Sequence, residues 1–340
     1  MKKLLPTILI IILVLLSACG NDRFSESDYY GTDLDSSVLK KGTIDKNKPD
    51  YQLGNSFENI NSEGIFVFVN GVLYFCRDSS IIKSEDFGKT ETIVFSLDDK
   101  EAGNFRNINI MGNTLYWTDS YYIYKLNLDS EEFHKSKNEF DSGNSIDHIY
   151  LINDLIVIYV SDAIWTMNTD FTQKQRIAYG EFYDLLFYNG YIYFRNDSNG
   201  YIEYISLDGT IHETVYSAGR CYSLSLQGNK LYFIESGLRY IDLTTNEEVF
   251  IDADYSEDDE IYSFENELVL FEWNRTDNKS IMIFNNLEKG ETQEILGVAY
   301  RSIHTINGKL LGRKEYDSTE WFVLDNSTYT WKTFITANCY

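Results

Sequence analysis

A short run of aliphatic and aromatic residues recurs seven times along this 340-residue chain, each time after a turn. One copy reads Asn189-Gly190-Tyr191-Ile192-Tyr193-Phe194. Aligned on one aliphatic position per copy, the copies are 42, 40, 37, 39, 37 and 42 residues apart, at Leu73, Leu115, Leu155, Ile192, Leu231, Leu268 and Leu310. A period near 40 residues with β-type content is typical of the blades of a β-propeller.

Each repeat divides into four short runs in which apolar and polar residues often alternate. In the second repeat the expected strands are Phe105–Met111, Thr114–Asp119, Tyr122–Asp129 and Glu132–Lys137. Val, Ile, Tyr and Phe dominate these runs, and turn pairs such as Asn-Gly separate them, which favours strands over helices. We therefore expect an all-β chain in which residues 56–340 form a seven-bladed β-propeller of four-stranded antiparallel blades, with six or eight blades as alternatives.

The first repeat already begins with an innermost strand, at Ile65. Ring closure then requires either contact between the first and last sheets or an outer strand borrowed from residues 50–62. The sequence leaves both possibilities open.

The N-terminus has the pattern of an export signal. Lys2 and Lys3 precede an apolar run that is shorter than the roughly 20 residues a membrane-spanning helix needs. The sequence Leu16-Ser17-Ala18-Cys19 then resembles the bacterial lipobox, in which cleavage precedes a lipidated cysteine. We expect residues 1–18 to be a lipoprotein signal peptide, although an ordinary signal peptide is the alternative. Acylation of Cys19, with palmitate among its chains, would hold the protein at the extracytoplasmic face of the cell membrane.

The chain is strongly acidic, with a formal net charge of -24. Removal of residues 1–18 takes away two lysines and no acidic residue, which leaves -26. Such a charge argues against nucleic acid as a partner, because phosphate binding needs basic patches. Residues 19–55 are polar and acidic without sustained hydrophobic periodicity, so we expect them to form a flexible acidic tether, part of which docks on the ring from about residue 50.

Two repeats resemble a known family. Leu115-Tyr116-Trp117-Thr118-Asp119 is similar to the YWTD repeat of low-density-lipoprotein-receptor-type propellers. The copy at Asn189 resembles a group of uncharacterised bacterial relatives of that repeat, the DUF5050 group, which are typically exported or lipid-anchored. The resemblance covers residues 63–338 and implies the fold. Receptor propellers have six blades and this chain has seven repeats, so the match is to the repeat and not to a whole receptor module.

Signatures of catalysis and metal binding are weak. The segment Ser84-Glu85-Asp86-Phe87-Gly88-Lys89-Thr90 resembles the Asp box of sialidases, and that resemblance implies a turn-stabilising element remote from any active site. The four histidines are scattered, and the chain contains no nucleophile elbow or zinc-site spacing. We expect no metal and no cofactor; the acidic segment 252–260 could bind calcium but is better interpreted as a solvated loop. A disulfide between Cys76 and Cys339 is conceivable, and buried thiols are the alternative.

The turns between first and second strands are short and uniform, so we expect a ligand to bind at the opposite face. The expected ligand-binding residues there are Arg77, Trp117, Asp119, Tyr183, Arg195, Trp273, Arg275 and Arg301, with Arg220 and Arg313 nearby. Arginine and aromatic side chains suit carbohydrate, carboxylate or protein contacts. We therefore expect a monomeric, non-enzymatic binding or scaffolding lipoprotein for a protein or glycan of the cell envelope. A glycan-active hydrolase or lyase that uses the same face is the alternative.

Overall fold

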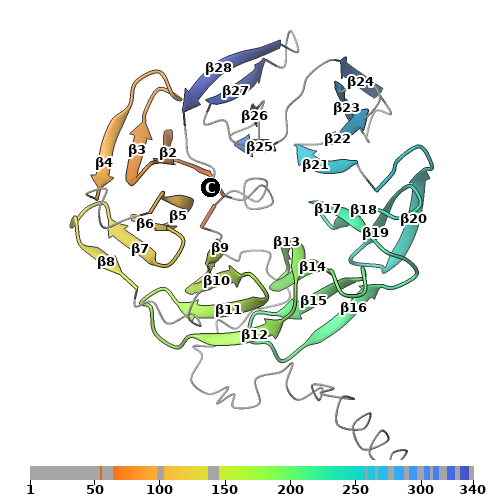
Figure 1. Ribbon diagram of the computed structural model, residues 1–340, viewed down its shortest axis with the longest axis horizontal. Helices are drawn as coiled ribbons and strands as arrows, with labels where there is room; N and C mark the ends of the chain where they lie inside the picture. Colours follow the sequence, from red (N-terminus) through yellow and green to blue (C-terminus); the bar gives the residue numbers. More distant parts are fainter. Residues whose placement is uncertain are drawn as a thin grey trace, which may run out of the picture.

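The computed structural model describes residues 54–55, 64–97, 103–136, 145–257, 259–264, 267–274, 279–286, 291–296, 302–306, 309–313, 320–325 and 330–336. They form seven four-stranded antiparallel sheets arranged as blades around a ring (Figure 1). The predicted seven-bladed propeller is confirmed. The four predicted strands of the second blade agree with the observed ones to within one or two residues.

Strands follow one another from the centre of the ring outward in every blade. Blades one to four contain β1 (Phe66–Val69), β2 (Val72–Arg77), β3 (Ser80–Ser84), β4 (Thr92–Ser96), β5 (Arg106–Met111), β6 (Thr114–Thr118), β7 (Ile123–Asn127), β8 (Phe133–Lys135), β9 (Ile146–Ile152), β10 (Leu155–Val160), β11 (Ala163–Asn168), β12 (Gln175–Tyr179), β13 (Phe182–Tyr188), β14 (Tyr191–Asn196), β15 (Ile202–Ser206) and β16 (His212–Tyr216). Blades five to seven contain β17 (Tyr222–Gln227), β18 (Lys230–Ile234), β19 (Leu238–Asp242), β20 (Glu247–Asp252), β21 (Glu260–Phe264), β22 (Glu267–Asn274), β23 (Lys279–Asn286), β24 (Glu291–Leu296), β25 (Ser302–Ile306), β26 (Lys309–Arg313), β27 (Glu320–Asp325) and β28 (Thr330–Thr336).

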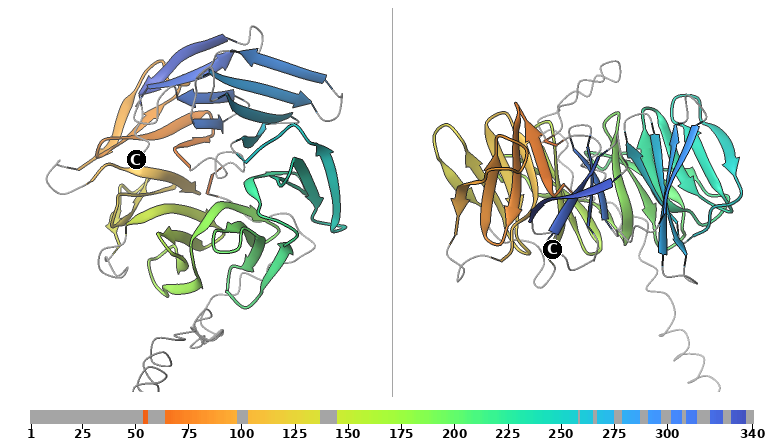
Figure 2. Two further views of the ribbon diagram at one scale, coloured as in Figure 1. Left: turned by 45° about the vertical axis from the view of Figure 1, so that its right-hand side comes forward. Right: turned by 90° about the horizontal axis from the view of Figure 1, so that it is seen from above.

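The antiparallel order gives the ring two different faces, which Figure 2 shows edge-on. The hairpin face carries the turns between first and second strands and those between third and fourth strands. The linker face carries the loops between second and third strands and the links from one blade to the next.

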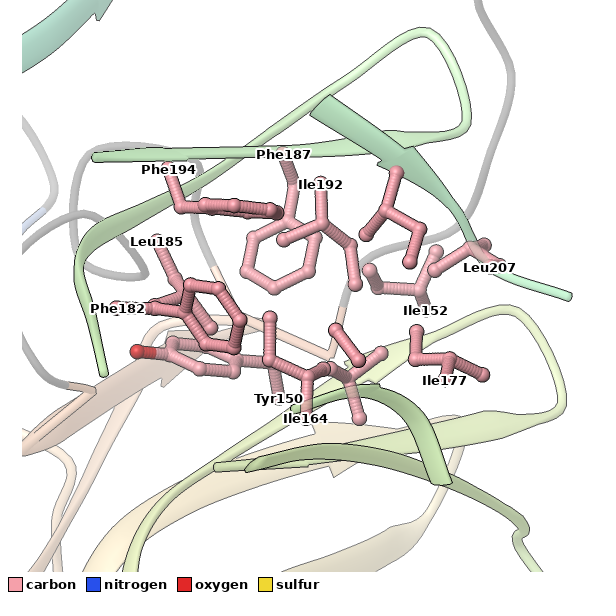
Figure 3. Packing of buried hydrophobic residues seen from close by; sticks show 13 residues of the cluster. Tyr150, Ile152, Ile164, Ile177, Phe182, Leu185, Phe187, Ile192, Phe194 and Leu207 are labelled. Atoms are coloured by element: carbon pink, nitrogen blue, oxygen red, sulfur yellow. The ribbon is translucent and has the colours of Figure 1, made fainter. Parts of the chain in front are cut away.

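Apolar side chains fill the space between neighbouring blades. Figure 3 shows the cluster between blades three and four, where the rings of Tyr150 and Phe187 are 4.8 Å apart and those of Phe182 and Phe194 are 4.5 Å apart. Burial of each such side chain contributes roughly 1.5–3 kcal/mol to folding. The recurring aliphatic-aromatic run supplies the second strands, and its middle residues, such as Ile192, are fully buried.

The ring closes by packing of the first sheet against the last. Phe66 of β1 meets Trp321 of β27 edge-on, with ring centroids 5.1 Å apart, and both side chains are fully buried. The first and last blades each consist of four consecutive strands. Of the two closure modes left open by the sequence, the structure shows direct sheet contact, and the described residues contain no borrowed outer strand.

Gly54 and Asn55 form an arm inside the ring, visible as the short red trace in Figure 1. Gly54 N donates a hydrogen bond to the Leu151 carbonyl oxygen (2.8 Å), and the main-chain N of Ile110 donates to the Gly54 carbonyl oxygen (2.6 Å). The Asn55 side-chain amide donates to one main-chain carbonyl in β1 and one in β5, both at 2.9 Å. The arm thus joins three innermost strands, and both of its residues lie in the segment expected to dock on the ring.

Aspartates at the hairpin face stabilise turns between third and fourth strands. Asp86 accepts hydrogen bonds from the main-chain N and the hydroxyl of Thr90, at 2.7 and 2.8 Å. These bonds lower the pKa of Asp86 to about 2. Asp170 and Asp242 accept in the same way from Thr172 and Thr244, and these bonds also lower their pKa. The Asp-box segment therefore serves as a turn, as its resemblance implies.

Because the pKa of Asp86 is lower in the folded chain than in the unfolded one, its stabilising contribution is complete above the unfolded pKa and is lost as pH falls through the folded pKa. We predict that Asp86→Ala lowers the melting temperature at pH 7, and that the difference from the wild type vanishes as pH falls from about 5 to about 2. Thermal scans across this range measure it, with Asp254→Ala in an exposed loop as the control. A difference that persists unchanged at pH 2 would contradict the assigned role.

Gly54 lies too close to β9 to tolerate a side chain. A Cβ at this position would approach the Cβ of Leu151 to 2.4 Å, whereas a Cβ at Gly103 would remain 3.5 Å from Asp119. We predict that Gly54→Ala lowers the free energy of unfolding by about 1–3 kcal/mol, the typical cost of overpacking. Urea titration measures the loss, with Gly103→Ala as a matched control that should change little. Equal stability of the two variants would show that the arm contributes nothing to the fold.

Candidate functional site

Two of the predicted binding residues, Trp117 and Asp119, have structural roles. Trp117 is fully buried and stacks on Tyr124, with ring centroids 5.7 Å apart. Asp119, which is also buried, accepts hydrogen bonds from the main-chain N of Tyr121 and Tyr122. These positions correct the expectation that Trp117 and Asp119 face a ligand, because neighbouring side chains and main chain already occupy them.

Arg77 lies at the end of β2 and forms a two-point ion pair with Glu91, at 2.7 and 2.9 Å. Trp273 lies in β22. Arg275 and Arg301 lie outside the described residues, so their proposed roles stay predictions. Among the predicted residues whose side chains the structure describes, Arg77, Trp117 and Asp119 belong to blades one and two, whereas Tyr183 and Arg195 belong to blade four.

Tyr183 and Arg195, however, do come together at the linker face. The guanidinium carbon of Arg195 lies 4.6 Å from the ring centroid of Tyr183 and 5.9 Å from that of Tyr222, so two aromatic rings flank the cation. The Tyr183 side chain belongs to the few large hydrophobic residues that remain exposed, with 45% of its surface accessible. Arg195 itself keeps only 14% of its side-chain surface exposed.

Two aspartates and a second arginine surround this stack. Arg195 forms ion pairs with Asp184 (3.5 Å) and Asp197 (3.9 Å), and Arg220 donates a hydrogen bond to Asp197 at 2.9 Å. The Arg220 side chain is half exposed. We call Tyr183, Asp184, Arg195, Asp197, Arg220 and Tyr222 the Arg195 cluster. Two guanidinium groups pair with two carboxylates within it, and a third carboxylate, that of Glu257, hydrogen-bonds Tyr222 at its edge.

A β-bulge in β13 positions the inner part of the cluster. The pairing of β13 with β14 shifts register between Tyr183 and Leu186, and Asp184 has a positive φ of 56°. Aspartate tolerates this left-handed conformation better than most residues. The bulge turns the Asp184 carboxylate toward the next blade, where it accepts a hydrogen bond from the main-chain N of Leu224 at 3.3 Å. Desolvation raises the pKa of Asp184, and the nearby Arg195 offsets this effect only in part.

A glycine positions the outer part of the cluster. Gly200 lies in the loop between β14 and β15 with φ of 73°, and a Cβ there would come within 2.3 Å of the Cγ of Arg220. The stem of Arg220 therefore lies directly on the main chain of this loop. This contact holds its guanidinium group beside Asp197.

The sequence interpretation did not identify Asp184, Asp197 and Tyr222 as members of the site. The sequence contains one signal for the bulge, a polar residue at the equivalent position of three innermost strands: Asn107, Asp184 and Ser223. In the structure all three have a positive φ at a register shift. The spacing of Asp197 and Tyr222 from Arg195 carries no comparable signal. Their proximity results from the packing of blade four against blade five.

Other polar groups serve the fold. Glu203 is buried, and burial opposes its ionisation, but hydrogen bonds from His212 (2.8 Å), Asn199 and Asn196 outweigh this and lower its pKa. Cys76 and Cys221 are buried free thiols, whose pKa burial raises; Cys339 lies outside the described residues.

In the acidic segment 252–260, Asp259 accepts hydrogen bonds from the main-chain N and the hydroxyl of Ser256, and Glu257 hydrogen-bonds the Tyr222 side chain of β17. Within the part of the chain that the structure describes, no group of three His, Cys, Asp or Glu side chains could hold a metal ion. No helix in that part is long and apolar enough to cross a membrane.

Comparisons with known proteins show the fold alone. No family model matches the chain, and no curated protein matches it. The structure of YCF48 bound to D1 peptide matches with 11% identity over 85% of this chain and 97% of that chain, with a TM-score of 0.52. The WD40 domain of SCAP from fission yeast matches with 11% identity over 84% of this chain and 86% of that chain, with a TM-score of 0.51. A chain of a nidogen/laminin complex aligns at 16% identity over 66% of this chain and 92% of that chain, with a TM-score of 0.41.

Trp117 and Tyr121 of blade two, one buried and one exposed, test whether Trp117 serves packing and not ligand contact. We predict that Trp117→Ala lowers the free energy of unfolding by about 3–5 kcal/mol, because it empties a fully packed space between blades. Tyr121→Ala, at a side chain that is 51% exposed, should change it by less than about 0.5 kcal/mol. Chemical denaturation compares the two. A Trp117→Ala variant as stable as the wild type would restore Trp117 as a candidate ligand contact.

Proposed function

We propose that this protein is a non-enzymatic binding propeller, anchored at the extracytoplasmic face of the cell membrane by lipid on Cys19, whose Arg195 cluster docks an envelope protein. The lipobox-like sequence Leu16-Ser17-Ala18-Cys19 supports the anchor. The propeller supports the docking role, since such rings present a broad face of variable loops on a rigid frame.

The observation that carries the proposal is the exposed ring of Tyr183 lying against the guanidinium of Arg195. Tyrosine and arginine are enriched among the residues that dominate the energy of protein interfaces. A tyrosine held against its neighbours loses little conformational freedom when a partner covers it. Tyr183 is in this state, because Arg195 lies 4.6 Å from its ring centroid and is itself held by Asp184.

The ion pairs of the cluster favour binding over acid-base chemistry. Asp197 forms ion pairs with both Arg195 and Arg220. Asp184 forms an ion pair with Arg195 and accepts a hydrogen bond from the main-chain N of Leu224. Carboxylates committed to guanidinium groups are poorly placed to act as a glycosidase acid and base, which need distinct environments. YCF48, similar in fold to this chain, has been solved with a bound peptide, which agrees with a peptide segment as the docked element.

Partner capture tests the proposal. The full chain is immobilised and incubated with solubilised envelope proteins, and captured proteins are identified by mass spectrometry and then purified for affinity measurement. We predict that Tyr183→Ala weakens binding of the captured partner about tenfold or more, as expected for a central interface residue. Tyr121→Ala serves as the matched control, because it removes an equally exposed tyrosine from the same face and should leave affinity unchanged.

Two outcomes would contradict the proposal. Equal binding by the wild type and Tyr183→Ala would exclude the Arg195 cluster as the docking site. Turnover of envelope glycans by the purified wild type, with loss of that activity in Asp184→Asn, would replace the binding function with an enzymatic one.

A further inference from the structure

The arm formed by Gly54 and Asn55 has a direction inside the ring. Its two residues bond to β5 at different heights. Ile110, whose main-chain N donates to Gly54, lies two residues before the hairpin turn that begins at Gly112. Ile108, whose carbonyl oxygen accepts from Asn55, lies four residues before it. From Gly54 to Asn55 the contacts therefore move away from the hairpin face.

The neighbouring blades agree with this direction. In β9, Leu151 accepts from Gly54 and lies two residues before the turn at Asn153. In β1, Phe66 accepts from Asn55 and lies four residues before the turn at Asn70. The contacts to β5, which bonds both residues, and those to β9 and β1, which bond one each, thus place Gly54 nearer the hairpin face and Asn55 nearer the linker face.

We propose that the chain enters the ring from the hairpin face, with Gly54 and Asn55 lying against the innermost strands of three blades, so that the membrane tether leaves opposite the Arg195 cluster. The steric demand at Gly54 supports a fixed path, because a side chain there would come within 2.4 Å of the Leu151 Cβ. Asn55 is also buried, and its amide uses both of its donors on strands of two different blades.

This path would turn the hairpin face toward the membrane and the linker face toward envelope proteins, a consequence that rests on the proposed membrane anchor. If residues 19–53 form the tether expected from the sequence, a flexible chain of that length spans about 30 Å and would bias the orientation of the ring without fixing it. The hairpin face is then on average nearer the lipid surface. The linker face, with Tyr183 exposed, points toward envelope proteins and does not compete with the anchor for space.

Distance measurements test this path without any membrane. The full chain with Cys19→Ser and Cys339→Ser carries one nitroxide at Asp50→Cys and a second at either Ser130→Cys or Tyr121→Cys. Ser130 and Tyr121 are exposed positions of blade two at the hairpin face and the linker face, respectively. Cys76 and Cys221 are buried and should not label. Because Asp50 lies four residues before Gly54, within roughly 14 Å of chain, electron–electron distances should be shorter to Ser130 than to Tyr121.

Equal distances, or a shorter distance to Tyr121, would overturn this path. The same labels in a Gly54→Leu chain provide the control for the arm itself. We expect that variant to lose the difference between the two distances, because the leucine side chain cannot fit beside Leu151. A difference unchanged by Gly54→Leu would show that the arm does not set the path.

A vesicle experiment separates this inference from the anchor. Lipidated full chain is bound to phosphatidylcholine vesicles that contain a headgroup quencher, with a fluorophore at Ser130→Cys or Tyr121→Cys. Stronger quenching at Ser130 supports the orientation, and equal quenching contradicts it. Cys19→Ser is the control and is expected not to float with vesicles. If the wild-type chain also fails to float, the proposed anchor is wrong, and the distance measurements still decide the path of the arm.

Discussion

The burial of both faces of every sheet is the constraint on which this structure depends. A four-stranded sheet alone would leave two apolar faces in water, and only the neighbouring blades can cover them. The fully buried Trp117 shows the consequence, since it packs against Phe95, Phe105 and Tyr124 within one continuous aromatic cluster. Closure between Phe66 and Trp321 completes the same arrangement and leaves no blade without a neighbour. Residues of the recurring run are therefore committed to packing and cannot vary to suit a ligand.

The sequence predicted this framework well because the framework repeats. Seven copies of one strand pattern, with turns at regular intervals, favour seven blades and indicate the strand order and the two faces before any side chain is placed. The same regularity explains the error at Trp117. A strand whose two faces are both buried has no exposed side, so the familiar Tyr-Trp-Thr-Asp sequence signals packing and not recognition. Tyr183 differs because it lies at the start of β13, at the linker face, where its ring stays exposed beside a bulge.

Departures from the repeat were harder to predict. Asp197 and Arg220 meet because Gly200 lets one loop lie against the next link, a contact between segments with no shared pattern. The arm is a similar case, because Gly54 and Asn55 look like the rest of an acidic tether until main-chain partners from three blades are present. Neither feature depends on periodicity. Both depend on close approach of main chain, which a single sequence encodes only as an isolated glycine.

In the Arg195 cluster, the charged groups and the aromatic surface should contribute differently to binding. Its carboxylates and guanidinium groups already satisfy one another, so a partner that replaces these ion pairs gains little net energy but must match their geometry. The exposed ring face of Tyr183 forms no ion pair that a partner would have to replace, so covering it simply removes apolar surface from water. Affinity should therefore come mainly from the aromatic surface and specificity from the surrounding charges.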